Sequence, residues 1–168
     1  PRAYLVGCGF DADDGEAEKL VHFVLKHADA PVLVDGTGLD ALVSAKGRRL
    51  LRRRFLNGNP TVVTPHAGEA ARLARPFDLP VDDPCALAEA LSLAYGVAKA
   101  GTGDVLAGMT AALLAQGLDP FEASVLGAEL HARAGLAAAA RWSTIAATAE
   151  DVVACIPDAI AELASASS

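Results

Sequence analysis

One stretch of this chain combines the residue types that handle a phosphate group, and it reads Ala100-Gly101-Thr102-Gly103-Asp104-Val105-Leu106. It comes just before a predicted helix over residues 105–115, which is rich in Ala and Leu. Backbone N–H groups at a helix N-terminus are unpaired and partly positive, so they attract anions such as phosphate. Gly101 and Gly103 lack a Cβ and let the backbone approach that anion closely. Asp104 would repel a phosphate, but it suits a base that takes a proton from a group attacking phosphorus.

A second interpretation of the same segment needs no chemistry. Asp is among the residues favoured at helix N-caps, so Asp104 could simply begin an ordinary helix. The loop alone leaves both interpretations open, and the rest of the chain has to decide between them.

Length and composition predict one domain with an aliphatic core. The chain has 168 residues, of which 52% are hydrophobic and only 5% aromatic, and its mean hydropathy is +0.32. A net charge of −7 and a pI near 5.0 disfavour binding to nucleic acid or to an anionic membrane. The basic cluster at residues 46–54 interleaves with Leu50 and Leu51, which indicates the solvated face of a short helix.

The cysteines point to a reducing compartment. Cys8, Cys85 and Cys155 are odd in number and widely spaced, which predicts no disulfide framework and no metal-ligand motif. We therefore expect a cytoplasmic protein, and no apolar run is long enough to span a bilayer.

Three short apolar runs predict the strands of a parallel sheet. They cover residues 3–6, 31–35 and 61–63; each ends in a polar or glycine-rich turn, and helical segments separate them. In open sheets of this kind, ligands bind beyond the carboxyl ends of the strands. Cys8, Gly9, Asp35 and His66 all follow such ends, so we expect them to lie near one crevice.

The second half of the chain is predicted to be helical. Helices are expected over residues 83–95 and 104–116, and Asp119-Pro120-Phe121-Glu122 is a strong signal for the start of another. A weaker signal at residues 148–151 starts a last helix, which Pro157 is expected to end or restart. His22 and His27 are predicted at the surface of an amphipathic helix.

Four segments carry a resemblance to a known family. They are GCGF, VLVDGTGLDAL, TVVTPHAGEAARL and AKAGTGDVLAGMTAALLAQGLDPFEASVLGAELHARAG, and they resemble the ADP/ATP-dependent NAD(P)H-hydrate dehydratases over residues 5–161. TPHAGE and GTGDVLAG together are specific, whereas GTGD alone is shared by many ribokinase-like kinases. The resemblance implies an α/β fold, a ribokinase-like three-layer α/β/α sandwich with a mostly parallel central sheet.

The resemblance also implies an activity. ADP or ATP, with Mg²⁺, phosphorylates the ring hydroxyl of hydrated NADH or NADPH, and phosphate elimination then restores NAD(P)H. The family resemblance further implies a homo-oligomer and an NAD(P)H-hydrate epimerase as a fused domain or a separate partner. The alanine-rich residues 134–140 suit close helix packing, either against a partner subunit or within one chain.

Site residues follow from the matched motifs. Asp104 corresponds to the family's base, which contacts the substrate hydroxyl, and Gly101, Thr102 and Gly103 correspond to its nucleotide-binding turn. His66 of TPHAGE and Gly9 correspond to residues that contact the hydrated dinucleotide.

The chain also departs from the family pattern. Cys8 replaces a family proline, and the family's KGxxT strand and following hairpin have no counterpart between Tyr95 and Lys99. We therefore expect one dehydratase domain over residues 1–168 that lacks an N-terminal part and a segment near residue 97. Two alternatives remain: a ribokinase-like kinase of a thiazole or pyrimidine alcohol, and a nucleotide-binding protein without activity.

Overall fold

A parallel four-stranded sheet forms the middle layer of the fold. The computed structural model describes residues 1–10, 15–79, 81–95, 98–99, 103–143 and 145–166. Within them the strands lie side by side in chain order, β1 (Tyr4–Val6), β2 (Val32–Val34), β3 (Thr61–Val63) and β4 (Ala98–Lys99). Val6 pairs with Val34, Val34 with Val63 and Val63 with Lys99, so all four strands end at the same edge.

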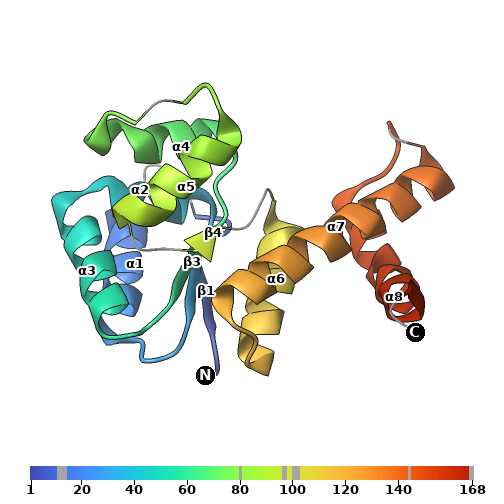
Figure 1. The fold of residues 1–168 in the computed structure, drawn as a ribbon, viewed down its shortest axis with the longest axis horizontal. Helices are drawn as coiled ribbons and strands as arrows, with labels where there is room; N and C mark the ends of the chain where they lie inside the picture. Colours follow the sequence, from blue (N-terminus) through green and yellow to red (C-terminus); the bar gives the residue numbers. More distant parts are fainter. Residues whose placement is uncertain (11–14, 80, 96–97, 100–102, 144, 167–168) are drawn as a thin grey trace.

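Helices cover both faces of this sheet (Figure 1). The segments that connect successive strands lie on one face, as expected when right-handed crossovers all step in the same direction. They are α1 (Gly15–His27), η1 (Gly36–Leu39), α2 (Asp40–Val43), α3 (Ala45–Leu56), α4 (Ala67–Ala74), η2 (Arg75–Phe77) and α5 (Pro84–Tyr95). The opposite face carries α6 (Asp104–Gln116) and part of α7 (Pro120–Trp142), and α8 (Ala149–Ala166) packs on α7.

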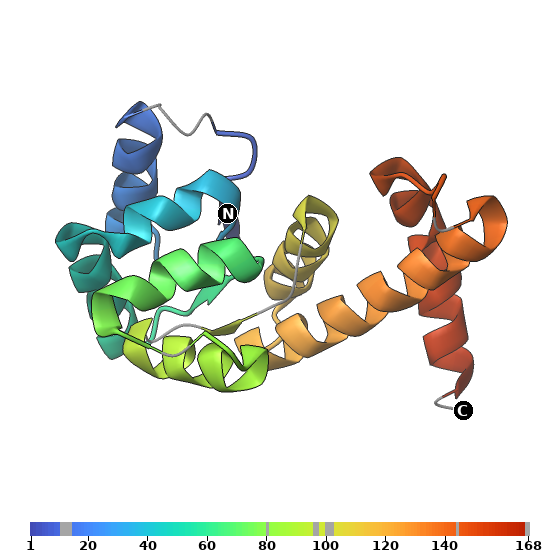
Figure 2. The ribbon, with the colours of Figure 1, turned by 90° about the horizontal axis from the view of Figure 1, so that it is seen from above.

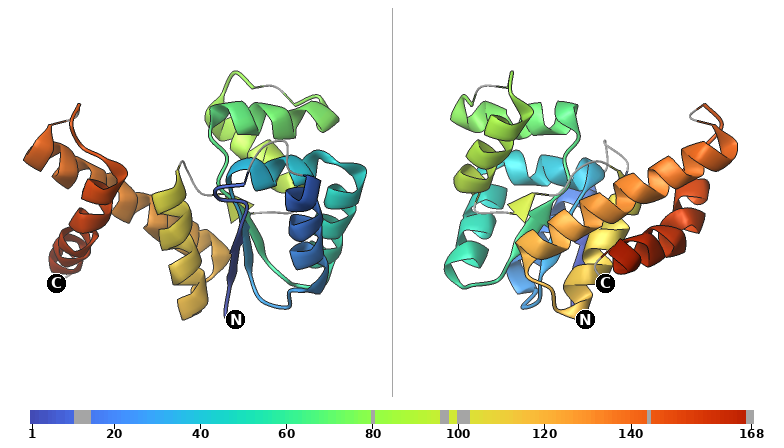
Figure 3. Two further views of the ribbon diagram at one scale, coloured as in Figure 1. Left: turned by 180° about the vertical axis from the view of Figure 1, so that it is seen from behind. Right: turned by 45° about the vertical axis from the view of Figure 1, so that its right-hand side comes forward.

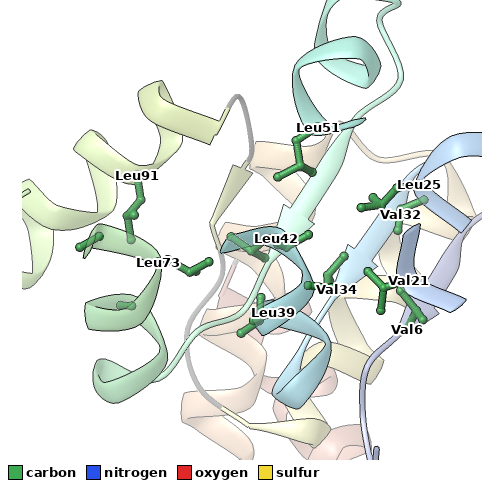
Figure 4. Close-up of a cluster of buried hydrophobic side chains, with 14 of the residues drawn as sticks. Val6, Val21, Leu25, Val32, Val34, Leu39, Leu42, Leu51, Leu73 and Leu91 are labelled. Atoms are coloured by element: carbon green, nitrogen blue, oxygen red, sulfur yellow. The ribbon is translucent and has the colours of Figure 1, made fainter. Parts of the chain in front are cut away.

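Strand residues fill two cores, one on each side of the sheet. Val32 and Val34 point into the larger core beneath α1–α5, with Leu42 and Leu73 among its members (Figure 4). Leu33 lies between them in sequence and points the other way, into a smaller core with Val62, Ala107, Leu114 and Ala123. Burial on both faces explains why these strands are continuous apolar runs rather than alternating ones.

The far half of α7 and the whole of α8 project from the sheet as an arm (Figures 2 and 3). A third small core holds the arm together, built mainly of Ala134, Ala138, Cys155 and Ala159. None of the helices in the described part of the chain is long and apolar enough to cross a membrane.

The structure confirms most of the predicted elements. The strands at β1, β2 and β3, the α6 helix and the start of α7 at Pro120 after its Asp119 cap are all present. The two-residue strand β4 was not predicted, because two residues carry no pattern of their own.

Three details of the sequence interpretation are wrong. Arg54, in the basic cluster predicted to form a solvated helix face, is only 3% exposed, and its guanidinium donates hydrogen bonds to the Thr61 hydroxyl and to the backbone carbonyls of Ala28, Ala30 and Pro60. Pro157 neither ends nor restarts α8, because Cys155 and Ala159 on either side of it are both buried against α7. His22 is buried rather than exposed, since its Nε2 lies 3.0 Å from the Ala41 carbonyl oxygen and is satisfied inside the fold.

Replacing Gly127 should weaken the contact between α6 and α7. A Cβ at Gly127 would lie 2.6 Å from the buried Thr110 Oγ1, so we expect Gly127→Ala to lower the free energy of unfolding by about 1–3 kcal/mol. Gly135→Ala in the same helix meets no atom within 4 Å and should raise it by about 0.5–1 kcal/mol. Urea denaturation measures both, and equal effects of the two variants would contradict the packing argument.

Candidate active site

The turn after β1 packs directly on the end of β2. Gly7 has a φ of +108°, and a Cβ there would lie 2.1 Å from the Asp35 carbonyl oxygen, so only glycine fits. The next residues, Cys8 and Gly9, are thereby held beside the start of the Gly36–Leu39 turn. Gly9 is exposed, with a φ of +72°, and a Cβ there would meet no atom of the described residues within 4 Å.

Asp35 is the buried carboxylate of the site. Only 4% of it is exposed, and Thr64 Oγ1 at the end of β3 donates a 2.6 Å hydrogen bond to its Oδ1. Cys8 Sγ, 3.7 Å from Oδ2, donates to the other oxygen. The buried carboxylate therefore has a fixed orientation, set by residues that follow β1 and β3, the two strands on either side of β2.

Asp104 reaches the same edge from the opposite layer. It is the first residue of α6, and Gly103 (φ +104°) holds the N-cap position, so Asp104 is not the cap that the second interpretation assumed. Asp104 is exposed. One ligand atom each from Cys8, Asp35 and Asp104 lies within 4.8 Å of the other two. Gly101 and Thr102, which were predicted to complete this turn, lie outside the described residues.

His66 lies at the same edge of the sheet, after β3, and caps α4. Its Nδ1 accepts a 3.0 Å hydrogen bond from the Gly68 N–H, and Glu69 Oε2 accepts one of 2.9 Å from the His66 N–H. Because Nδ1 is an acceptor, Nε2 carries the proton of the neutral ring, 3.5 Å from Glu69 Oε1. The imidazole is nevertheless 59% exposed, so its outer edge is open to a ligand.

The thiol of Cys8 is protonated at neutral pH. Burial is the largest cause and the negative charges of Asp35 and Asp104 act in the same direction; together they raise the pKa of Cys8 to about 12. A neutral thiol is a poor nucleophile, so Cys8 acts as a hydrogen-bond donor to Asp35.

The convergence of Cys8, Asp35 and Asp104 was only partly anticipated. Cys8 and Asp35 were expected near one crevice because both follow strand ends, whereas the sequence was thought to hold no set of metal ligands. These three potential ligands are 27 and 69 residues apart along the chain. A motif search that needs close spacing cannot find them.

Comparison with known proteins decides between the families that share the GTGD loop. A sequence model described as NAD(P)H-hydrate dehydratase matches residues 1–97 and 82–158. The chain belongs to this family. It is 31% identical over 161 residues to the ADP-dependent (S)-NAD(P)H-hydrate dehydratase of Neisseria meningitidis, covering 79% of this chain and 53% of that protein.

Other members of the dehydratase family are longer proteins. The bifunctional NAD(P)H-hydrate repair enzyme Nnr of Mycobacterium tuberculosis is 40% identical over 151 residues, which cover 73% of this chain and 30% of Nnr. The chain thus spans about half or less of these curated relatives. The solved structure of Bacillus subtilis YxkO, a UPF0031 family member, shares the fold with a TM-score of 0.76 at 20% identity, over 96% of this chain and 66% of YxkO.

The high pKa of Cys8 predicts an unreactive thiol. At pH 8 we expect iodoacetamide to modify the exposed Cys85 while Cys8 stays largely unmodified, because the thiolate is the reacting form. Asp35→Asn removes one of the charges that raise the pKa, so Cys8 should then react faster, and at a lower pH. Asp40→Asn, at an exposed position on α2, should leave the rate unchanged. Peptide mass spectrometry measures each site, and rapid labelling of Cys8 in the unmodified chain would contradict this account.

Proposed function

We propose that this chain carries out the ADP-dependent dehydration of hydrated NADH or NADPH, restoring NAD(P)H. The observation that carries the proposal is an exposed carboxylate, Asp104, at the N-terminus of α6 and at the carboxyl edge of a parallel sheet. An anion-binding helix end next to a base is what transfer of a phosphoryl group to an alcohol requires. The names of the relatives add the donor, ADP, and the substrate class.

Asp104 is the proposed base. Its carboxylate takes the proton of the ring hydroxyl while the hydroxyl oxygen forms a bond to the terminal phosphorus of ADP. The bond between that phosphorus and the bridging oxygen breaks, and AMP leaves. The C–O bond to phosphate then breaks and the neighbouring ring carbon loses a proton to solvent, so that inorganic phosphate leaves and the double bond of the dihydronicotinamide is restored.

Backbone groups are proposed to hold the transferred phosphate. The first N–H groups of α6 face it, and a Cβ at Gly103 would meet no atom of the described residues within 4 Å, which leaves room for the nucleotide to approach. Gly101 and Thr102 complete the proposed nucleotide-binding turn.

A magnesium ion fits the oxygen donors of this site. Asp35 offers carboxylate oxygens, the ligand type that Mg²⁺ takes alongside phosphate oxygens, and this leaves Asp104 free to act as the base, whereas the Cys8 sulfur does not suit Mg²⁺. When bound, Mg²⁺ would neutralise charge on the phosphates of the donor.

His66 and Gly9 are the proposed contacts for the hydrated dinucleotide. His66 keeps its Nδ1 on the α4 backbone and exposes the rest of the ring, so its Nε2–H can donate to a ligand. Gly9 is exposed in the turn after β1, which packs on Asp35. A side chain at this position would stand between the ligand and the edge of the sheet.

A kinase of a small alcohol is the alternative, because it would use the same base and the same helix end. The products separate the two functions. The dehydratase releases inorganic phosphate and restores absorbance of the dihydronicotinamide, whereas a kinase retains phosphate on its product. A protein that binds nucleotide without turnover would do neither.

Asp104→Asn should abolish turnover while ADP binding is retained. Loss of the base should reduce kcat about 10²–10⁴-fold, and removal of a negative charge beside the phosphates should leave ADP affinity equal or higher. Recovery of dihydronicotinamide absorbance from hydrated NADH and ADP measures turnover, and calorimetry measures ADP binding. Asp82→Asn, another exposed carboxylate, is the control and should be fully active. Turnover that persists in Asp104→Asn would show that Asp104 is not the base.

His66→Asn separates helix capping from substrate contact. Asn is itself a good N-cap, so the free energy of unfolding should change by less than about 0.5 kcal/mol, whereas His66→Ala should lose about 1 kcal/mol. Both variants remove the imidazole, so both should raise KM for the hydrated dinucleotide several-fold with little change in KM for ADP. Unchanged kinetics in His66→Asn would leave His66 with capping alone.

We propose that residues 1–168 form one dehydratase domain from which a segment near residue 97 is missing. The alignment with the Nnr protein of Salinibacter ruber spans 191 positions, more than this chain has residues. The two ranges matched by the family model also overlap at residues 82–97, just before β4. The gene sequence around Val97 tests this directly. A stretch there that encodes a KGxxT segment would support the proposal, whereas codons for residues 95–104 that follow one another without an insertion would oppose it.

An NAD(P)H-hydrate epimerase is proposed as a fused domain or a separate partner enzyme. Self-association of the chain through the arm is proposed as well. Of the two packings open to the alanine-rich segment, Ala134 and Ala138 take the one within the chain, where they are buried against α8. A different stripe of α7, which begins near the sheet and runs into the arm, is open: Val125 is 54% exposed and Leu136 in the arm is 72% exposed, three helical turns further along.

Leu136→Glu should weaken this association. A charge in the open stripe would have to be desolvated in any interface between copies, so the dissociation constant should rise at least about tenfold. Sedimentation of this variant and of Glu122→Gln as a control measures it. A monomeric unmodified chain would contradict the proposed self-association.

A further inference from the structure

The candidate site also gathers the donor set of a softer metal ion. We propose that Cys8 Sγ, one Asp35 oxygen and one Asp104 oxygen bind a thiophilic divalent cation of the Zn²⁺ or Cd²⁺ class, and that this cation inhibits the enzyme by occupying Asp104. The binding rests on the geometry, charge and donor chemistry of these three residues, and not on the proposed function. The inhibition rests on the proposed function, in which Asp104 is the base.

The three donors are close enough to share one ion. All three lie within 4.8 Å of one another, and they come from three different segments: the turn after β1, the end of β2 and the start of α6. Ligands of a tetrahedral zinc ion, with bonds of about 2.0–2.3 Å, lie about 3.3–3.8 Å apart. Asp104 is exposed, so its side chain can rotate toward the other two donors.

The charge balance of the cluster favours a cation. Two carboxylates and a thiol face one another, and in the described part of the chain no Lys, Arg or His forms an ion pair with Asp35 or Asp104. The hydrogen bond from Thr64 fixes the orientation of Asp35, as outer-shell groups do for metal ligands. A bound cation would thus replace the repulsion between the two carboxylates with attraction to the ion, and Asp35 would not have to reorient.

Cys8 selects the kind of cation. Thiolate ligands favour Zn²⁺ and similar ions, whereas Mg²⁺ and Ca²⁺ take oxygen ligands. On binding, the Cys8 S–H bond breaks, its proton passes to solvent, and the sulfur forms a bond to the metal with no change in oxidation state. The fourth position stays open to water, because Asp104 lies at the exposed side of the cluster.

Cadmium titration tests the site without relying on turnover. The probe is Cd²⁺, whose bond to a thiolate gives an ultraviolet charge-transfer band, added to a Cys85→Ser background that removes the exposed thiol. We expect the band to saturate at one Cd²⁺ per chain, to vanish in Cys8→Ser, and to need at least about tenfold more Cd²⁺ in Asp104→Asn. Asp82→Asn should leave the affinity unchanged.

The outcomes separate the site from the proposed function. No band in the Cys85→Ser chain, a band that survives Cys8→Ser, or equal affinity in Asp104→Asn and Asp82→Asn would overturn the metal site. Because Asp104 is exposed, its variant should fold normally even if Cys8→Ser does not, and circular dichroism checks both. If metal-free chain turns over and keeps its full rate as the band saturates, the inhibition is wrong although the site stands. If the metal-free chain never turns over, the proposed function fails and the spectral result still decides the site.

Discussion

Parallel pairing of three-residue strands in one register is the constraint on which the candidate site depends. Val6, Val34 and Val63 are aligned across the sheet, so the residues that follow them emerge at one edge. Burial on both faces fixes that register, because a shift by one residue would exchange Leu33 with Val32 or Val34 between the two cores. Packing of the apolar side chains therefore determines where Asp35 lies.

Backbone contact then completes the site. The turn at Gly7 rests on the backbone of Asp35 and Gly38, closer than any side chain would allow, and this brings Cys8 to the Asp35 carboxylate. From the other layer, α6 presents Asp104 through the Gly103 turn. One buried, oriented carboxylate and one exposed carboxylate thus share an edge, and the second is free to act on a ligand.

Local sequence predicted the elements, and the packing between them had to come from the structure. Residues 61–63 could be assigned to a strand because an apolar run ended at a Thr-Pro turn, and α7 because Asp119 and Pro120 mark a helix start. The burial of His22 depends on a carbonyl of α2, 19 residues away, which no local pattern contains. For the same reason the ligand set at Cys8 was missed, since its members meet only after three segments pack. The matched motifs gave His66 a ligand role, and the structure adds that its Nδ1 is already used to cap α4.

A crystal structure of the chain with ADP and a non-reactive analogue of hydrated NADH tests the central claim most directly. The account predicts the terminal phosphate of ADP at the first N–H groups of α6 beside Gly103, with the ring hydroxyl within hydrogen-bond distance of an Asp104 oxygen. A nucleotide bound elsewhere, or a ring hydroxyl held by another residue with Asp104 facing solvent, would contradict it.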